Sequence, residues 1–114
     1  MKAVMYLEKG KVGVCDIEKP VCPPDEVMVK IEYCALCATD VHLVTNGLFG
    51  VTEPLTLGHE MSGTVVEIGP EVPEGLFELG DKVTANPVPS CGVCPQCRKG
   101  LPQHCEKAAF NPAN

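Results

Sequence analysis

Residues 26–33 read EVMVKIEY, and the alternation within this stretch decides the fold class. Val27, Val29 and Ile31 fall on one face of an extended chain, and the residues between them fall on the other. This period of two is the pattern of a half-buried β-strand. Similar short apolar runs with turn residues between them occupy residues 2–7, 12–17, 61–69 and 81–85. Several short strands separated by turns predict a mainly β, barrel-like domain.

Local signals add detail to this prediction. Gly10 lies between the runs 2–7 and 12–17, and a β-hairpin is expected there because glycine readily takes the positive φ of a tight turn. Residues 37–45 (CATDVHLVT) lack alternation and are followed by Asn46-Gly47, which indicates a short helix that ends there. Gly63, inside the run 61–69, indicates a bulge or a close approach of a neighbouring backbone.

The composition excludes some classes of partner. The chain has 114 residues, which is enough for one domain. Fifteen acidic and nine basic residues give a net charge of -6, which argues against nucleic acid because phosphate neutralisation needs a basic face. No segment approaches the about 18 consecutive apolar residues of a membrane span, and the start lacks a secretory signal. We therefore expect a cytoplasmic protein whose eight cysteines serve metal binding or catalysis rather than disulfides.

A second informative stretch is the run of cysteines at residues 90–105, SCGVCPQCRKGLPQHC. Cys91, Cys94, Cys97 and Cys105 offer four thiolates, and four thiolates form a closed tetrahedral zinc site that stabilises and does not catalyse. Disulfides are disfavoured by the two-residue spacing and by the compartment. An iron–sulfur cluster is the closer rival, but the ferredoxin pattern closes after three residues, and here seven intervene. We expect a structural-zinc lobe at about residues 87–107.

A second set of metal-ligand types lies in residues 37–42 (CATDVH) and 58–60 (GHE). A catalytic zinc needs three protein ligands and one open position. Cys37 and His59 are suitable ligands from separate segments, and Glu60 offers an adjacent oxygen. The alternative, at this point, is that Cys37 is a small core residue and His59 a surface histidine with ordinary hydrogen bonds.

Taken together, these motifs resemble those of a known enzyme family. CATDVH, residues 58–69 (GHEMSGTVVEIG), residues 80–83 (GDKV) and the four-cysteine run occur in the order found in the zinc-containing medium-chain alcohol dehydrogenases. More narrowly, they resemble the polyol and threonine dehydrogenase branch. The resemblance spans nearly the whole chain and implies a GroES-like, partly open β-barrel with short helices and a zinc-binding lobe, over residues 1–114.

The resemblance also implies a ligand set. Cys37 and His59 would bind the catalytic zinc, and Glu60 would lie beside it as an alternate ligand or as a neighbour of the ligands. Asp40 would accept a hydrogen bond from the ring of His59 and so orient the ring and raise its basicity. The four sulfurs of the cysteine run would bind the structural zinc.

The same resemblance implies an oxidoreductase that transfers hydride between a small-molecule alcohol and NAD(P). Thr39 would take the proton from the alcohol, and His42, three residues further along the helix, would pass it towards solvent. Zinc would lower the pKa of the alcohol as a Lewis acid. The hydride chemistry would belong to the cofactor.

The chain also departs from the pattern of the family. It is much shorter, and it contains no GxGxxG, so we expect no cofactor-binding Rossmann domain, an incomplete catalytic domain and no activity for this chain alone. Unpaired barrel edges would permit a homo-oligomer. The alternative from another class is a stand-alone zinc-stabilised binding module without catalysis.

Predictions also follow for four further residues. Cys34 forms a C-x2-C with Cys37, but we expect a buried, small apolar side chain at a strand end. His104 is adjacent to a sulfur ligand and is expected to be exposed. Leu48 and Phe49 either border a substrate pocket or make a plain turn contact.

Overall fold

The structure is a computed structural model that describes residues 1–47 and 54–108. The predictions for Leu48 and Phe49 therefore lie outside the described residues. The described elements are β1 (Lys2–Glu8), β2 (Lys11–Asp16), β3 (Val27–Ala35), α1 (Ala38–Asn46), β4 (Leu55–Thr56), β5 (Glu60–Ile68), β6 (Lys82–Thr84), α2 (Pro95–Arg98) and the 3-10 helix η1 (Pro102–His104). Within these ranges no helix is long and apolar enough to cross a membrane.

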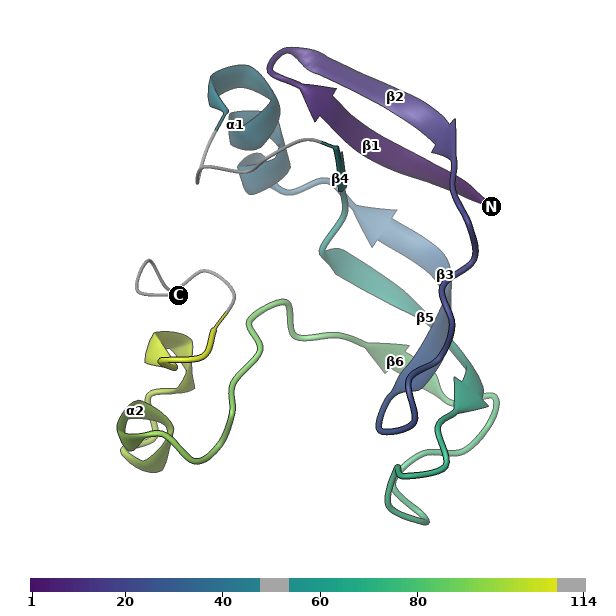
Figure 1. The fold of residues 1–114 in the computed structure, drawn as a ribbon, viewed down its shortest axis with the longest axis vertical. Coiled ribbons are helices and arrows are strands. Elements are labelled where there is room, and N and C mark those ends of the chain that lie inside the picture. Colours follow the sequence, from purple (N-terminus) through teal and green to yellow (C-terminus); the bar gives the residue numbers. More distant parts are fainter. Residues whose placement is uncertain (48–53, 109–114) are drawn as a thin grey trace.

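The strands form two three-stranded antiparallel sheets, as Figure 1 shows. The strand orders are β2-β1-β4 and β3-β5-β6, and the described strands do not close into a barrel. The predicted mainly β fold with short helices is confirmed, and the open arrangement agrees with a partly open barrel. The radius of gyration is 15.9 Å. A compact domain of this size has about 13 Å, so the chain is spread out.

The first sheet begins with the predicted hairpin. β1 pairs with β2 from Lys2 opposite Asp16 to Glu8 opposite Lys11, and Gly10 takes a φ of 80° in the turn. The backbone N–H of Gly10 donates to the carbonyl of Val44 at 2.7 Å. This bond ties the hairpin turn to α1, so the helix is held against the first sheet.

The second sheet contains the strand that the EVMVKIEY stretch predicted, with two irregularities in its register. Along β3 and β5 the pairing is irregular between Met28 and Val29 and again between Ile31 and Tyr33. Gly63 confirms the expected close approach, because an added Cβ would lie 2.2 Å from the carbonyl oxygen of Lys30.

One residue of the predicted buried face is more exposed than expected. Ile31 is 47% exposed, although Val27 and Val29 on the same predicted face are half-buried. Its cross-strand partner is Gly63. Side chains in a sheet are covered by their cross-strand neighbours, and a glycine offers no side chain to do so.

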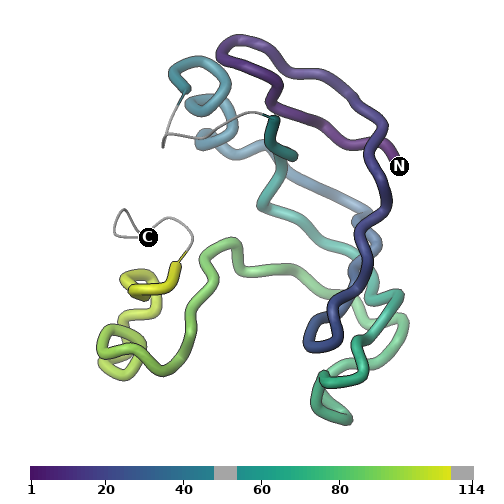
Figure 2. Tube along the Cα trace, in the orientation of Figure 1, coloured from purple at the N-terminus to yellow at the C-terminus, as the bar shows by residue number. Residues whose placement is uncertain are grey.

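The hydrophobic core is small. Its buried side chains in the sheet region are Met5, Tyr6, Leu43 and Val65. Figure 2 shows that the chain after β6 runs away from the sheets and ends in a separate lobe that contains α2 and η1. We call residues 87–107 the cysteine lobe, because its interior is made of sulfur-bearing side chains rather than large apolar ones.

Candidate metal centres

The cysteine lobe brings its four sulfurs together. The Sγ atoms of Cys91, Cys94, Cys97 and Cys105 all lie within 4.8 Å of one another, and those of Cys94 and Cys105 are 4.0 Å apart. Four sulfurs bound to one zinc at about 2.3 Å would lie about 3.8 Å apart in a tetrahedron. The four side chains therefore fit a zinc ion with little movement.

Backbone amides face these sulfurs. The N–H of Cys94 donates to Cys91 Sγ at 3.3 Å, and the N–H of Cys97 donates to Cys94 Sγ at 3.5 Å. Cys105 Sγ accepts from the N–H of Cys91 at 3.3 Å and from that of Lys107 at 3.4 Å. Tight turns direct these amides inwards, so the lobe is built to hold negative sulfur.

The pKa values of the thiols reflect this arrangement. The backbone N–H groups of Cys97 and Glu106 lower the pKa of Cys94 to about 6. The backbone N–H of Cys91 likewise lowers the pKa of Cys105. Burial, by contrast, raises the pKa of Cys97 to about 12. Metal ligands must be deprotonated to bind, and a divalent cation among the sulfurs is what would allow all four to ionise together.

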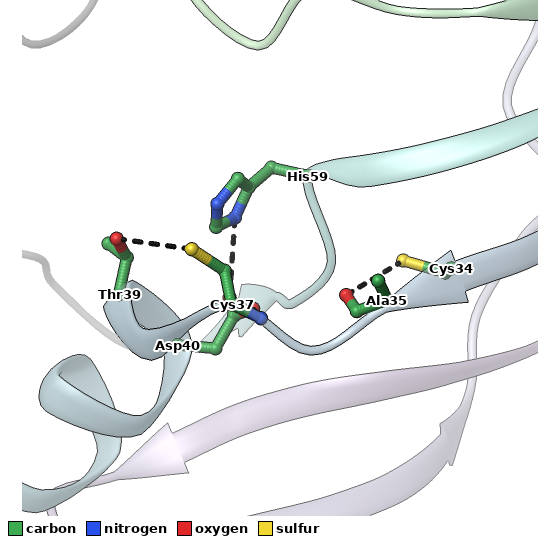
Figure 3. A network of polar contacts seen from close by, with 6 residues as sticks. All are labelled: Cys34, Ala35, Cys37, Thr39, Asp40 and His59. Carbon is green, nitrogen blue, oxygen red and sulfur yellow. Dashed lines mark hydrogen bonds and ion pairs between the residues drawn. The ribbon is translucent and has the colours of Figure 1, made fainter.

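A second donor cluster lies where β3 and β5 meet. Cys37, His59 and Glu60 each offer one ligand atom, and these atoms lie within 4.8 Å of one another. Cys37 is the N-cap residue of α1 and is separated from β3 only by Leu36, and His59 directly precedes β5. The pairing of Ala35 with Glu60 brings the two segments together. Figure 3 shows Cys37 and His59 close to each other. Thiolate, imidazole and carboxylate are all zinc ligands, so the donor set fits this metal.

Asp40 connects the two sides of this cluster. It is 5% exposed, and its Oδ2 accepts the backbone N–H of Cys37 at 3.1 Å. Its Oδ1 lies 3.4 Å from Nδ1 of His59. A buried carboxylate is costly unless its oxygens are paired, and both oxygens of Asp40 have partners. The same side chain therefore holds the helix start and the histidine ring.

The two predicted proton-transfer residues lie on α1. The hydroxyl oxygen of Thr39 is 3.5 Å from Sγ of Cys37, so it lies at the cluster (Figure 3). His42 is exposed on the same helix. Residues three apart on a helix share a face. The structure thus places Thr39 beside the ligands, and both Thr39 and His42 are exposed to solvent.

A cavity of about 430 Å³ opens beside the cluster. Thr39, Asp40 and His59 line one end, and Pro87 and Val88, at the start of the cysteine lobe, line another part. The volume is within the range of small-molecule sites. Sequence reasoning missed Pro87 and Val88 as cavity-lining residues, because loop residues of this kind carry no chemical signal.

The prediction for Cys34 was half wrong. Cys34 lies at the end of β3 as expected, but it is exposed rather than buried. β3 lies at the edge of its sheet. The Sγ atom of Cys34 packs against Gly58, where a Cβ added to the glycine would lie 2.6 Å from this sulfur. Figure 3 shows Cys34 apart from Cys37 and His59. The exposure predicted for His104 is confirmed.

The structure thus combines two sets of metal-ligand side chains. One is a closed set of four thiols in the cysteine lobe, and the other is a mixed cluster of thiol, imidazole and carboxylate beside the second sheet. Such a combination is typical of a class of zinc proteins. Comparison with known protein families agrees: residues 23–112 match the alcohol dehydrogenase GroES-like domain. The chain belongs to this family of alcohol dehydrogenases.

Individual relatives have several substrates in their names. The chain is 38% identical to scyllo-inosose 3-dehydrogenase of Thermotoga maritima, with 84% of this chain and 27% of the relative covered. It is 40% identical to cinnamyl alcohol dehydrogenase 1 of Capsicum annuum, with 77% and 24% covered. The solved structure of a zinc-dependent alcohol dehydrogenase from Streptococcus pneumoniae superimposes with a TM-score of 0.83 at 35% identity, with 96% and 32% covered. The chain thus spans between 24% and 32% of the length of these relatives.

Proposed function

We propose that this chain forms the N-terminal portion of the catalytic domain of a zinc-dependent alcohol dehydrogenase, with NAD(P) as the hydride acceptor. The observation that carries the proposal is the meeting of Cys37, His59 and Glu60, whose ligand atoms lie within 4.8 Å of one another beside a cavity. Residues 1–114 correspond in this proposal to the GroES-like domain at the N-terminal end of such enzymes.

The two donor clusters take different roles. The four cysteines of the lobe fill a tetrahedral zinc site and leave no open position, so that site is structural. The cluster of Cys37, His59 and Glu60 lies at a cavity, so it serves the reaction. When bound there, zinc supplies Lewis acidity, which favours the ionised form of the substrate alcohol.

Asp40 acts as the residue that positions both ligands. With Nδ1–H of His59 directed to Asp40 Oδ1, the Nε2 lone pair remains for a metal. The bond from the Cys37 N–H to the other carboxylate oxygen holds the start of α1, and with it the direction of the Cys37 side chain.

Thr39 and His42 provide the route for the proton. The Thr39 hydroxyl is at the cluster, 3.5 Å from the Cys37 sulfur, where it accepts the proton of the substrate alcohol at Oγ1 and gives up its own hydroxyl proton towards His42. His42 is exposed on the same helix, and its imidazole exchanges the proton with solvent. Such a relay is needed because one proton leaves for each hydride transferred.

The location and assembly of the protein belong to the same proposal. All eight cysteines are free thiols, which suits the reducing cytoplasm. β2, β3 and β6 lie at sheet edges within the described strands, and such edges can pair with another copy to give a homo-oligomer. The alternative of a binding module without catalysis accounts for the cysteine lobe, but it gives no reason for Thr39 and Asp40 to meet the second cluster.

The proposal is tested with the protein expressed from its whole gene. Mass spectrometry under native conditions should find about two zinc ions per chain, one for each donor set. Mixing the protein with NAD+ or NADP+ and a panel of alcohols should produce the reduced nicotinamide. One zinc per chain and no turnover with any alcohol would contradict the proposal and favour the binding module.

A further inference from the structure

The walls of the cavity beside the second cluster are unequal in polarity. The polar end is formed by Thr39, Asp40 and His59. Away from this end, the described lining consists mainly of apolar side chains, which are Leu43, Leu55, Leu57, Pro87 and Val88. A substrate whose hydroxyl reaches the cluster and whose body fills this cavity therefore contacts leucine, valine and proline side chains.

The polar side chains of the described lining already have partners. The two oxygens of Asp40 bind His59 and a backbone N–H. The hydroxyl of Thr56 donates to Sδ of Met5 at 3.2 Å. Thr39 lies at the cluster itself, where the reacting hydroxyl would lie. Among the described lining side chains, hydrogen-bonding capacity is thus concentrated at one end.

This distribution discriminates between two kinds of alcohol. Each hydroxyl that leaves water and finds no partner weakens binding by about tenfold or more. A polyol has several such hydroxyls besides the reacting one, so the factors by which its binding is weakened multiply. Each methylene that leaves water instead strengthens binding by about threefold to fourfold.

We propose that the site takes alcohols with an apolar aryl or alkyl body and selects against polyols. This inference rests on the proposed function and names the substrate class of the same site. The relatives by themselves leave the class open, because scyllo-inosose 3-dehydrogenase and cinnamyl alcohol dehydrogenase are similar to the chain at 38% and 40% identity. The apolar lining of the cavity is the observation that favours apolar alcohols over polyols.

The test compares hexan-1-ol and cinnamyl alcohol with sorbitol and xylitol, using the zinc-loaded protein from its whole gene and both nicotinamide cofactors. The expected kcat/KM is at least about 100-fold higher for the two apolar alcohols, from two or more unpaired hydroxyls in the polyols. Equal or faster turnover of a polyol would overturn this inference and leave the proposed function intact. No turnover of any alcohol would overturn both.

Binding without reaction gives a second measurement. Calorimetry with hexanamide and gluconamide, which carry the same amide on an apolar and on a hydroxylated body, should show at least about tenfold tighter binding of hexanamide. Equal affinity, or preference for gluconamide, would overturn the inference. This measurement does not depend on turnover, so it separates the substrate class from the reaction.

A matched pair of variants assigns the preference to the cavity wall. Val88→Thr keeps the shape of a lining side chain and adds a hydroxyl, whereas Val93→Thr makes the same change in the cysteine lobe, away from the lining. The ratio of hexan-1-ol to sorbitol turnover should fall about threefold to tenfold in Val88→Thr and stay constant in Val93→Thr. An equal ratio in both variants would contradict the role of this wall.

Discussion

The carboxylate of Asp40 lies 3.4 Å, from Oδ1 to Nδ1, from the ring of His59. Asp40 belongs to the first turn of α1, and His59 directly precedes β5, so the contact joins two segments that are distant in sequence. Its other oxygen accepts the N–H of Cys37 at 3.1 Å. One buried side chain therefore sets the separation of two proposed ligands.

Replacing Asp40 tests this positioning role. In Asp40→Asn, one carboxylate oxygen becomes an NH2 group, which cannot accept a hydrogen bond. Either the bond from the Cys37 N–H or the contact with the His59 ring is therefore lost. Zinc affinity at the second cluster should fall about tenfold to a hundredfold. Titration with a competing chelator measures the loss. Asp81→Asn is the matched control, because Asp81 caps a turn through the N–H of Glu78 far from the cluster, and it should leave zinc affinity unchanged.

Two neighbouring cysteines provide a second test. Cys37→Ser should abolish alcohol oxidation and remove one of the about two zinc ions per chain, because serine is a poor zinc ligand. Cys34→Ser should keep both zinc ions and the activity, since Cys34 is exposed and lies outside the cluster. Activity in Cys37→Ser at the level of Cys34→Ser would remove Cys37 from the catalytic site.

The cysteine lobe should depend on its metal for stability. Cys105 is 1% exposed and lies among the other three sulfurs, so Cys105→Ser should release one zinc ion and unfold the lobe. Because binding of structural zinc by small domains contributes about 10–16 kcal/mol to folding, the loss should be large. Amide hydrogen exchange of residues 91–108 measures this loss of stability. Cys15→Ser, outside both clusters, should leave exchange in this segment slow.

Gly63 should resist substitution. A Cβ at this position would lie 2.2 Å from the carbonyl oxygen of Lys30, and the backbone of β3 cannot move aside without breaking the ladder. Gly63→Ala should cost about 1–3 kcal/mol of the free energy of unfolding. Urea denaturation measures the change. In the control Gly13→Ala, the Cβ would meet side chains alone, the end of Leu7 at 3.1 Å and Sγ of Cys15 at 3.9 Å, so the cost should be smaller.

An ion pair across the second sheet gives a pH-dependent prediction. Nζ of Lys82 lies 2.6 Å from Oε1 of Glu32, and this hydrogen bond, followed by that from Thr64, lowers the pKa of Glu32. A lowered pKa in the folded state means that the stabilisation is present above the unfolded pKa and is lost as the pH falls towards the folded one. Lys82→Met should therefore raise the pKa of Glu32 and reduce the loss of folding stability at acid pH.

Carbon NMR of the Glu32 carboxylate measures the pKa directly. Lys30→Met is the matched control, because the charge of Lys30 is the smallest of the influences on Glu32 and the shift should be slight. Equal shifts in the two variants would show that the hydrogen bond of Lys82 has no special role.

Much of the secondary structure could be predicted from local patterns. The hairpin turn at Gly10, the strand that begins near Val27 and the helix that ends before Gly47 all follow from turn residues and short periodicities. The four thiols of the lobe could be found for the same reason, because residues 91–105 form one short run that folds back on itself. Interactions between near neighbours in sequence were sufficient for these features.

Other features depended on contacts between distant segments. The sequence named Cys37 and His59 as candidates, but their approach results from the register that pairs Ala35 with Glu60. The exposure of Cys34 and the apolar wall at Val88 depend on which strand lies at an edge and where a loop passes. Local propensity does not encode such placements, because they follow from how whole strands pair and pack.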